Sequence, residues 1–403
     1  MPRSRMPLAA LLAVVALAPA CAGPVVPDLI ISNARVFTND TARPWAEAVA
    51  IKGDRVVAVG SREAVAVLAG PSTRAIDAGG RVLVPGFNDA RVDLPLEPPT
   101  PAALAALDQM AITRGVTSVQ VVAGGPMRSL VVAAQQATRQ ARWRLIRSPE
   151  DTATLSTTDP TAMTRQDEKP FLPPQPGVRL VANGVAWQLG GWAGRRGLDA
   201  TRLDTVVAWA YGAEDPLVMT GAEGQWAAAL ARVGLTDVWR RKRPRLDVVG
   251  LVEYSEVQRL ASQGVVVAWT TAVVRDLRAG PQSFGIRPLL PGSLLDAGAV
   301  LALGSASQPG GAAVLAAATG ATTDRAGGRA MTREEAVRAM TWGSAYAEKA
   351  ERDKGWLGPG TLADIAVLSD DIFTVPAARL AAITSVLTLV GGTVVYDPGV
   401  LSK

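Results

Sequence analysis

Histidine is missing from this 403-residue sequence. Imidazole is the commonest metal ligand in proteins and the usual general base near neutral pH. Its absence excludes a Ser-His-Asp triad, a Cys-His dyad and every zinc site built on imidazole. Any chemistry of this protein must therefore work without that side chain.

Cysteine occurs once, at Cys21. It follows two arginines within the first five residues, a short apolar run over 8–17 and small residues at 18–20. The run is too short to span a bilayer comfortably, and the pattern is typical of an export signal. We expect residues 1–21 to be a lipoprotein-type signal peptide, with lipidated Cys21 holding the mature chain on the periplasmic side of the bacterial cell envelope. Simple secretion, with Cys21 as a bystander, is the alternative.

Charge gives little indication of a nucleic-acid partner. The net charge is +5, and 19% of residues are charged against 48% hydrophobic, which is ordinary for a chain with a large core. The one dense basic run, 240–245, lacks the interleaved aromatic residues that nucleic-acid binding would favour. We therefore expect no nucleic-acid partner.

Both ends of the sequence predict β-strands. Segments 48–52 and 55–59 flank Gly53-Asp54, which is the pattern of a hairpin. Further strands are expected near the other end, at 364–368, 385–390 and 393–396. We expect residues 22–84 and 351–403 to fold together as one β-sandwich domain.

The middle of the chain alternates short apolar strands with helical stretches. Strands are expected at 118–122, 178–181, 216–219, 265–268 and 300–303. A helix is expected over 333–340, opened by the capping pattern Thr332–Glu335. Repeated strand–helix units over about 260 residues are typical of a parallel barrel. We therefore predict an α/β fold with a (β/α)8 TIM-like barrel over residues 85–350.

The segment Pro85–Leu94 resembles the first barrel strand of the amidohydrolase superfamily, where the pattern is Pro-Gly-Phe-x-Asp-x-His-x-His. The segments 54–60, 115–119 and 358–368 are also similar to that family and follow in the expected order. The nearest branch is the group that includes formamide deformylases and D-aminoacylase-like enzymes. The resemblance implies a barrel with a composite β domain, hydrolysis of non-peptide carbon–nitrogen bonds, and zinc or another divalent metal.

The metal-ligand positions that the resemblance implies are all substituted. They fall at Arg91, Asp93, Arg179, Thr220, Val248 and Ala306. Arg179 takes the place of a metal-bridging lysine, and a guanidinium cannot take up carbon dioxide as an amine can. Ala306 takes the place of the aspartate that acts as the general base. We therefore expect no metal cofactor and no catalytic residue of the family type.

Four charged residues form a candidate ligand pocket at the barrel mouth: Arg91, Asp93, Arg179 and Asp247. One interpretation is that the two arginines bind an anionic ligand. The other is charge compensation, in which opposite charges satisfy one another where the metal was lost. The second interpretation predicts at least one arginine–carboxylate contact among the four.

Three functions remain open. The first is a catalytically inactive pseudoenzyme that acts as a binding or scaffold lipoprotein, with an unknown small molecule or protein as its partner. The second is a hydrolase of carbon–nitrogen bonds that uses a non-standard site. The third is a repurposed enzyme in which Asp93 or Asp247 acts as a metal-free acid or base.

Overall fold

The structure is a computed structural model. It describes residues 25–94, 99–123, 127–147, 179–188, 203–212, 216–220, 223–233, 236–248, 254–273, 289–320 and 328–402. The predicted signal segment, with Cys21, lies outside these residues. Among the described helices, none combines the length and the hydropathy that a membrane span requires.

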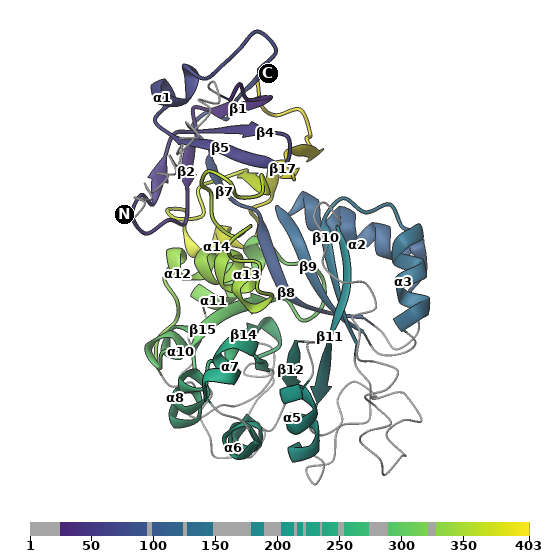
Figure 1. Ribbon diagram of the computed structural model, residues 1–403. Coiled ribbons are helices and arrows are strands. Elements are labelled where there is room, and N and C mark those ends of the chain that lie inside the picture. Colours follow the sequence, from purple (N-terminus) through teal and green to yellow (C-terminus); the bar gives the residue numbers. More distant parts are fainter. Residues whose placement is uncertain are drawn as a thin grey trace, which may run out of the picture.

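The middle of the chain forms one parallel sheet of eight strands in sequence order (Figure 1). They are β8 (Phe87–Asp93), β9 (Val116–Ala123), β10 (Arg142–Arg147), β11 (Leu180–Gln188), β12 (Leu217–Thr220), β13 (Arg245–Val248), β14 (Val266–Thr270) and β15 (Val300–Gly304). The edge strands β8 and β15 approach each other, because the Ala306 amide donates to the Arg91 carbonyl at 2.8 Å. A Cβ added to Gly304 would lie only 2.7 Å from the Arg91 nitrogen, so glycine permits this approach. No strand ladder in the described part of the chain joins β8 to β15.

The strand expected over 178–181 starts later and extends further, because β11 runs from Leu180 to Gln188. Two strands, β10 and β13, lie where no strand was predicted. β10 carries Arg142 and Arg144 at alternate positions, and β13 alternates Arg245 with Asp247, so neither has the sequence of an apolar run. Their arginines enter buried polar contacts instead of facing solvent.

Helices follow the strands and cover the outside of this sheet (Figure 1). They are α2 (Pro101–Thr113), α3 (Met127–Gln136), α5 (Leu203–Gly212), α6 (Glu223–Val233), α7 (Thr236–Lys242), α8 (Tyr254–Ser262), α10 (Pro291–Asp296), α11 (Ala312–Thr319), α12 (Arg333–Arg338) and α13 (Ser344–Ala347). The capping pattern predicted at Thr332 is confirmed, since Thr332 and Glu335 exchange side-chain-to-backbone hydrogen bonds. The helix it opens ends at Arg338 and continues as a π-helical turn, η5 (Ala339–Gly343).

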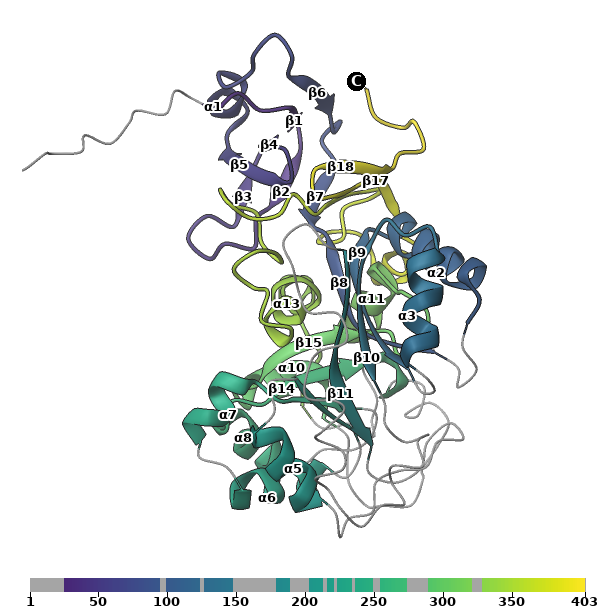
Figure 2. The ribbon, with the colours of Figure 1, turned by 45° about the vertical axis from the view of Figure 1, so that its right-hand side comes forward.

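Strands from both ends of the chain build the β domain (Figure 2). One sheet has the order β5-β4-β1-β6 and the other β18-β17-β16-β7-β2-β3. Their bounds are β1 (Leu29–Ser32), β2 (Arg35–Phe37), β3 (Trp45–Ala46), β4 (Ala48–Lys52), β5 (Arg55–Gly60), β6 (Arg74–Asp77), β7 (Val82–Pro85), β16 (Ile365–Leu368), β17 (Ser385–Val390) and β18 (Thr393–Tyr396), with helices α1 (Arg62–Ala66) and α14 (Ala377–Leu380). The antiparallel β4–β5 hairpin confirms its prediction. The pairing of β7 with β16 supports in part the composite β domain.

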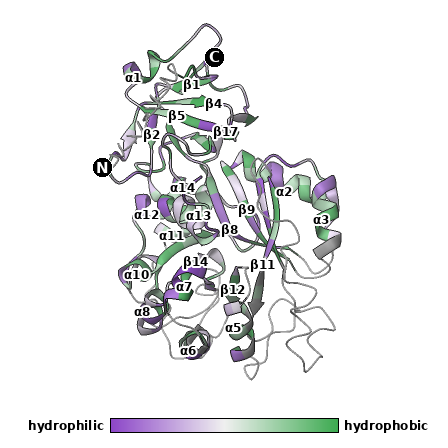
Figure 3. Ribbon diagram, viewed as in Figure 1, coloured by the Kyte–Doolittle hydropathy of each residue, from purple (hydrophilic) through white to green (hydrophobic). Residues whose placement is uncertain are grey.

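The large apolar core lies between the parallel sheet and its helices, whereas the inner face of the sheet is small or polar. Buried tryptophans such as Trp143, Trp226 and Trp269 belong to the outer core. The inner face carries alanines, among them Ala268 and Ala302, beside charged residues. Figure 3 shows hydrophilic residues interrupting β8 and β10, while β1 and β4 of the β domain are mostly apolar. Polar groups are therefore concentrated inside the sheet.

Candidate functional site

Two arginines and two aspartates pack together inside the parallel sheet. We call Arg91, Asp93, Arg245 and Asp247 the buried quartet. Each strand contributes a pair two residues apart, which places both members of a pair on one face. Arg91 and Arg245 are 2% exposed and Asp247 is fully buried. The two positive and two negative charges balance.

Asp247 joins the two halves of the quartet. Arg91 Nη1 donates to Asp247 Oδ2 at 2.9 Å, while Arg245 donates to both oxygens of Asp247 at 2.6 and 2.9 Å. Arg91 Nη2 lies 3.0 Å from Asp93 Oδ1. The arginine–carboxylate contact predicted among Arg91, Asp93, Arg179 and Asp247 is therefore present, and Arg91 also reaches across to β13.

Electrostatics keep Arg91 charged. Burial alone lowers the pKa of the Arg91 guanidinium, but the neighbouring charges of Asp93 and Asp247 outweigh burial and raise the pKa above its usual value. A buried ion pair is a weak net source of stability, because the loss of hydration offsets the attraction. Removing one partner is a different matter, since it leaves the other charge buried without compensation.

The network continues from the quartet toward the amino end of the sheet. Arg245 Nη1 donates to Gln120 Oε1 at 2.6 Å, and the Gln120 amide lies 3.5 Å from Asn88 Oδ1. Asn88 donates to Glu348 at 2.6 Å, and Lys354 Nζ is also 2.6 Å from Glu348. Although burial acts to raise the pKa of Glu348, the charges of Lys354 and Arg144 lower it. Linked polar side chains thus fill the interior along the length of β8.

Of the six predicted ligand positions, four gather at this site. The Thr220 hydroxyl accepts from Arg91 Nη1 at 2.9 Å, and Ala306 follows β15 and bonds to the Arg91 carbonyl. Arg91 and Asp93 belong to the quartet itself. On β13 the residue that pairs in register with Thr220 and contacts Arg91 is Asp247. The side chain of Val248 lies outside what the structure describes.

Arg179 lies elsewhere, which corrects its predicted place in the ligand pocket. It immediately precedes β11, at the amino end of the strand, and the strand runs away from it to Gln188. Its guanidinium donates to the carbonyls of Gln140 (3.0 Å) and Val390 (2.9 Å). Arg179 therefore links the sheet to the β domain, and Arg245 supplies the second arginine of the interior. The spacing of Arg245 and Asp247, identical to that of Arg91 and Asp93, carried this signal in the sequence.

Asp89 is a second buried carboxylate that the sequence reasoning did not single out. Oδ1 accepts from the amides of Ser305 (2.9 Å) and Arg91 (3.2 Å), and Oδ2 accepts from the Gly310 amide at 3.1 Å. Burial raises the pKa of Asp89 to about 6, although these amides and the Ser305 hydroxyl counteract the effect. One side chain thus holds both ends of the loop between β15 and α11.

Asp89 predicts a pH dependence of stability. Its pKa is about 6 in the folded chain, against 3.8 ordinarily, so between these values the folded state retains a proton that the unfolded chain releases. The free energy of unfolding should therefore fall as pH rises from 4 to 6, by about 3 kcal/mol from this residue. Urea unfolding of the protein and of Asp89→Asn at several pH values measures it. Parallel pH curves for the two proteins would contradict this prediction.

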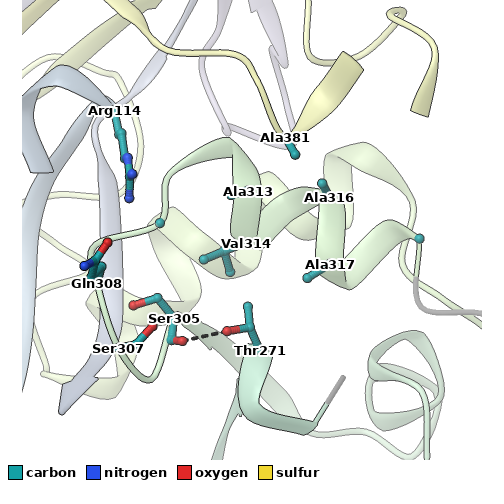
Figure 4. A pocket seen from close by; sticks show the side chains of 12 residues that line it. Arg114, Thr271, Ser305, Ser307, Gln308, Ala313, Val314, Ala316, Ala317 and Ala381 are labelled. Carbon is teal, nitrogen blue, oxygen red and sulfur yellow. Dashed lines mark hydrogen bonds between the residues drawn. The ribbon is translucent and has the colours of Figure 1, made fainter. Parts of the chain in front are cut away.

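A groove of about 590 Å³ lies on another side of the loop that Asp89 holds. Figure 4 shows Thr271 donating to the Ser305 carbonyl (2.6 Å), with Val314 and alanines of α11 forming the wall. Arg114, the one charged side chain in the lining, donates to the Pro309 carbonyl at 2.6 Å. The groove is therefore lined mainly by small residues and lies outside the buried quartet.

Comparison with known proteins agrees with the fold. The model of the amidohydrolase family matches residues 211–396. The chain is 41% identical over 63 residues to N-substituted formamide deformylase of Arthrobacter pascens, and 34% identical over 70 residues to Protein LONG AFTER FAR-RED 3 of Arabidopsis thaliana. Each match spans only 12% of the relative's length and 16–17% of this chain. The solved structure of atrazine chlorohydrolase TrzN from Arthrobacter aurescens TC1, complexed with zinc, aligns with a TM-score of 0.62 and 19% identity over 92% of this chain and 95% of that chain.

The parallel α/β sheet and the β domain built from both chain ends make up the fold that the chain shares with that solved structure. Residues 211–396 match the model of the amidohydrolase family, and the chain shares the fold of the solved structure over 92% of its length.

The described residues do not fit the zinc of that structural relative. Among them, no group of three or more histidine, cysteine, aspartate or glutamate side chains is placed to hold a metal ion. Both carboxylates of the quartet already accept from arginine, and a guanidinium has no lone pair to offer a metal. The side chains at this position form an ion-pair network and do not form a set of metal ligands.

Proposed function

We propose that this chain is a catalytically inactive member of the amidohydrolase superfamily that acts as a binding or scaffold lipoprotein of the bacterial cell envelope. The observation that carries the proposal is the position of Arg91. Its guanidinium lies between Asp93 and Asp247, where the resemblance would require histidines and a metal. Arginine stays protonated at physiological pH and can neither bind a metal nor accept a proton from water.

The quartet supports a role as a plug that fills the interior of the sheet, in preference to an anion-binding pocket. All four of its charges have partners within it, and the second arginine expected in a pocket, Arg179, lies at the other end of its strand. In this proposal the eight strands close into a (β/α)8 barrel, supported by the approach of Gly304 to Arg91. The small-molecule or protein partner then binds outside the former catalytic centre.

Zinc content and turnover test the proposal together. Protein purified from cells grown with excess zinc should contain far less than one equivalent by elemental analysis. It should also leave N-substituted formamides intact, which are tested because of the short similarity to the deformylase. Stoichiometric zinc would favour a hydrolase with a non-standard site. So would turnover that is lost when either Asp93 or Asp247 is mutated.

Lipid attachment at Cys21 is a separate expectation of the same proposal. The unchanged protein should fractionate with membranes, whereas Cys21→Ser should move to the soluble fraction, because one thioether-linked lipid group is lost. Equal fractionation of the two forms would remove the anchor from the proposal and leave the inactive fold in place.

A further inference from the structure

The β domain has an exposed apolar surface where the described chain begins. We call residues 25–26 and 62–74 the α1 surface. Val67, just after α1, is 81% exposed, and Val25 and Val26 are 51% and 42% exposed. At 81% exposure Val67 makes little packing contact within the described chain. Arg62 and Arg74 are also exposed at this surface, beside Glu63 and Glu47, whose carboxylate accepts from the Arg62 amide at 3.1 Å.

Specific contacts tie the start of the described chain to this loop. The Thr73 hydroxyl donates to the Pro27 carbonyl at 2.7 Å, and the Arg74 amide donates to the Asp28 carbonyl at 2.9 Å. Val26 packs closely against Gly70, since a Cβ added there would lie 2.6 Å from the valine. The described chain therefore begins beside the α1 surface.

The length of the tether sets how far this surface lies from a lipid on Cys21. Four residue steps separate Cys21 from Val25. At roughly 3.5 Å per step, a fully extended tether reaches about 14 Å. That is about half the thickness of a hydrocarbon core of roughly 30 Å.

We infer that the α1 surface rests on the phospholipid bilayer, with Val67 in the interface and Arg62 and Arg74 facing anionic headgroups. Exposed apolar residues grouped with basic ones suit an interface in which side chains meet both lipid and phosphate. This inference depends on the lipid anchor in the proposed function. It goes beyond the anchor by assigning the face of the protein that meets the membrane.

The contact also orients the rest of the molecule. The chain passes from β7 in the β domain into β8, and β8 runs away from that domain toward Asp93 (Figures 1 and 2). With the α1 surface on the bilayer, the carboxyl end of β8 points into the aqueous compartment. A partner that binds at that end would approach from the side opposite to the membrane.

Site-directed spin labelling tests the contact in the lipidated protein. The label is placed at Val67→Cys, with Val132→Cys on α3 (45% exposed) and Tyr254→Cys on α8 (42% exposed) as matched controls. Cys21 does not react with the label when its sulfur is a lipid thioether. The protein is reconstituted in vesicles of phosphatidylethanolamine and phosphatidylglycerol, and spin relaxation is measured with oxygen and with a water-soluble nickel complex.

The label at position 67 should show several-fold greater relaxation by oxygen than by nickel, relative to both controls. Adding Arg62→Glu and Arg74→Glu should reduce that ratio. A ratio at position 67 equal to the controls overturns the orientation. Mass spectrometry of the N-terminal peptide separates the two failures: lipidated Cys21 with a water-exposed label rejects only the orientation, whereas unmodified Cys21 rejects the anchor and the orientation with it.

Discussion

Asp247→Ala should lower the free energy of unfolding by about 3–5 kcal/mol, the range expected when one partner of a buried ion pair is removed. Asp247 is fully buried and accepts from both Arg91 and Arg245. Without it, Arg91 keeps Asp93, but Arg245 loses its carboxylate. The interior then holds one uncompensated positive charge. Urea unfolding followed by fluorescence measures the change.

The matched control is Asp204→Ala. Asp204 also pairs with an arginine, Arg232, but both side chains are more than half exposed. Water and salt screen such a pair, so its loss should have little effect. If Asp247→Ala fails to fold, Asp247→Asn keeps the shape while removing the charge, and it too should be strongly destabilised. Equal stability of the Asp247 and Asp204 variants would show that the quartet does not hold charge in the way described.

The sequence predicted contacts within a strand better than contacts between strands. The spacing of Arg91 and Asp93 was enough to predict that they share a face, because alternate residues of a strand do, and in the structure they are in contact. Residue spacing alone does not show that β13, which places Asp247 156 residues further along the chain, meets them inside the sheet. Asp247 was placed with them only through the family resemblance. Pairing over such a distance depends on the order of strands, which local patterns do not encode.

Strand limits explain the error at Arg179. An apolar run over 178–181 predicted a short strand with Arg179 inside it. The strand instead extends to Gln188, through the mixed sequence that includes Asn183 and Gly184. Gly184 has φ of +98°, an irregularity that masks the regular alternation of a strand. The shift moved the arginine from the predicted site to the opposite end of β11.

Asp89 shows a different limit. Its position in the Pro85–Leu94 motif was visible, yet its partners are backbone amides of Ser305 and Gly310. Almost any residue can supply a backbone amide, so the sequence does not indicate which residues donate to Asp89. The sequence therefore shows that Asp89 is a polar residue on a predicted strand. It does not show that the carboxylate holds a distant loop.

Replacing Arg91 and Asp93 together should destabilise the protein less than replacing Asp93 alone. Asp93→Ala leaves Arg91 and Arg245 to share Asp247, an excess of one positive charge in the interior, and should lower the free energy of unfolding by about 2 kcal/mol. The double variant Arg91→Met/Asp93→Leu removes one charge of each sign. Arg245 and Asp247 remain as a complete pair with two hydrogen bonds.

Urea unfolding of the single and double variants, measured side by side, decides the comparison. Apolar residues of similar bulk often replace a buried ion pair without loss of stability, because no hydration has to be given up. The double variant should therefore unfold at a higher urea concentration than Asp93→Ala. If the single variant keeps full stability but loses binding of an anionic ligand, the quartet is a binding pocket and not a plug. If the double variant is the less stable, Arg91 holds the interior through its other contacts, the Thr220 hydroxyl among them.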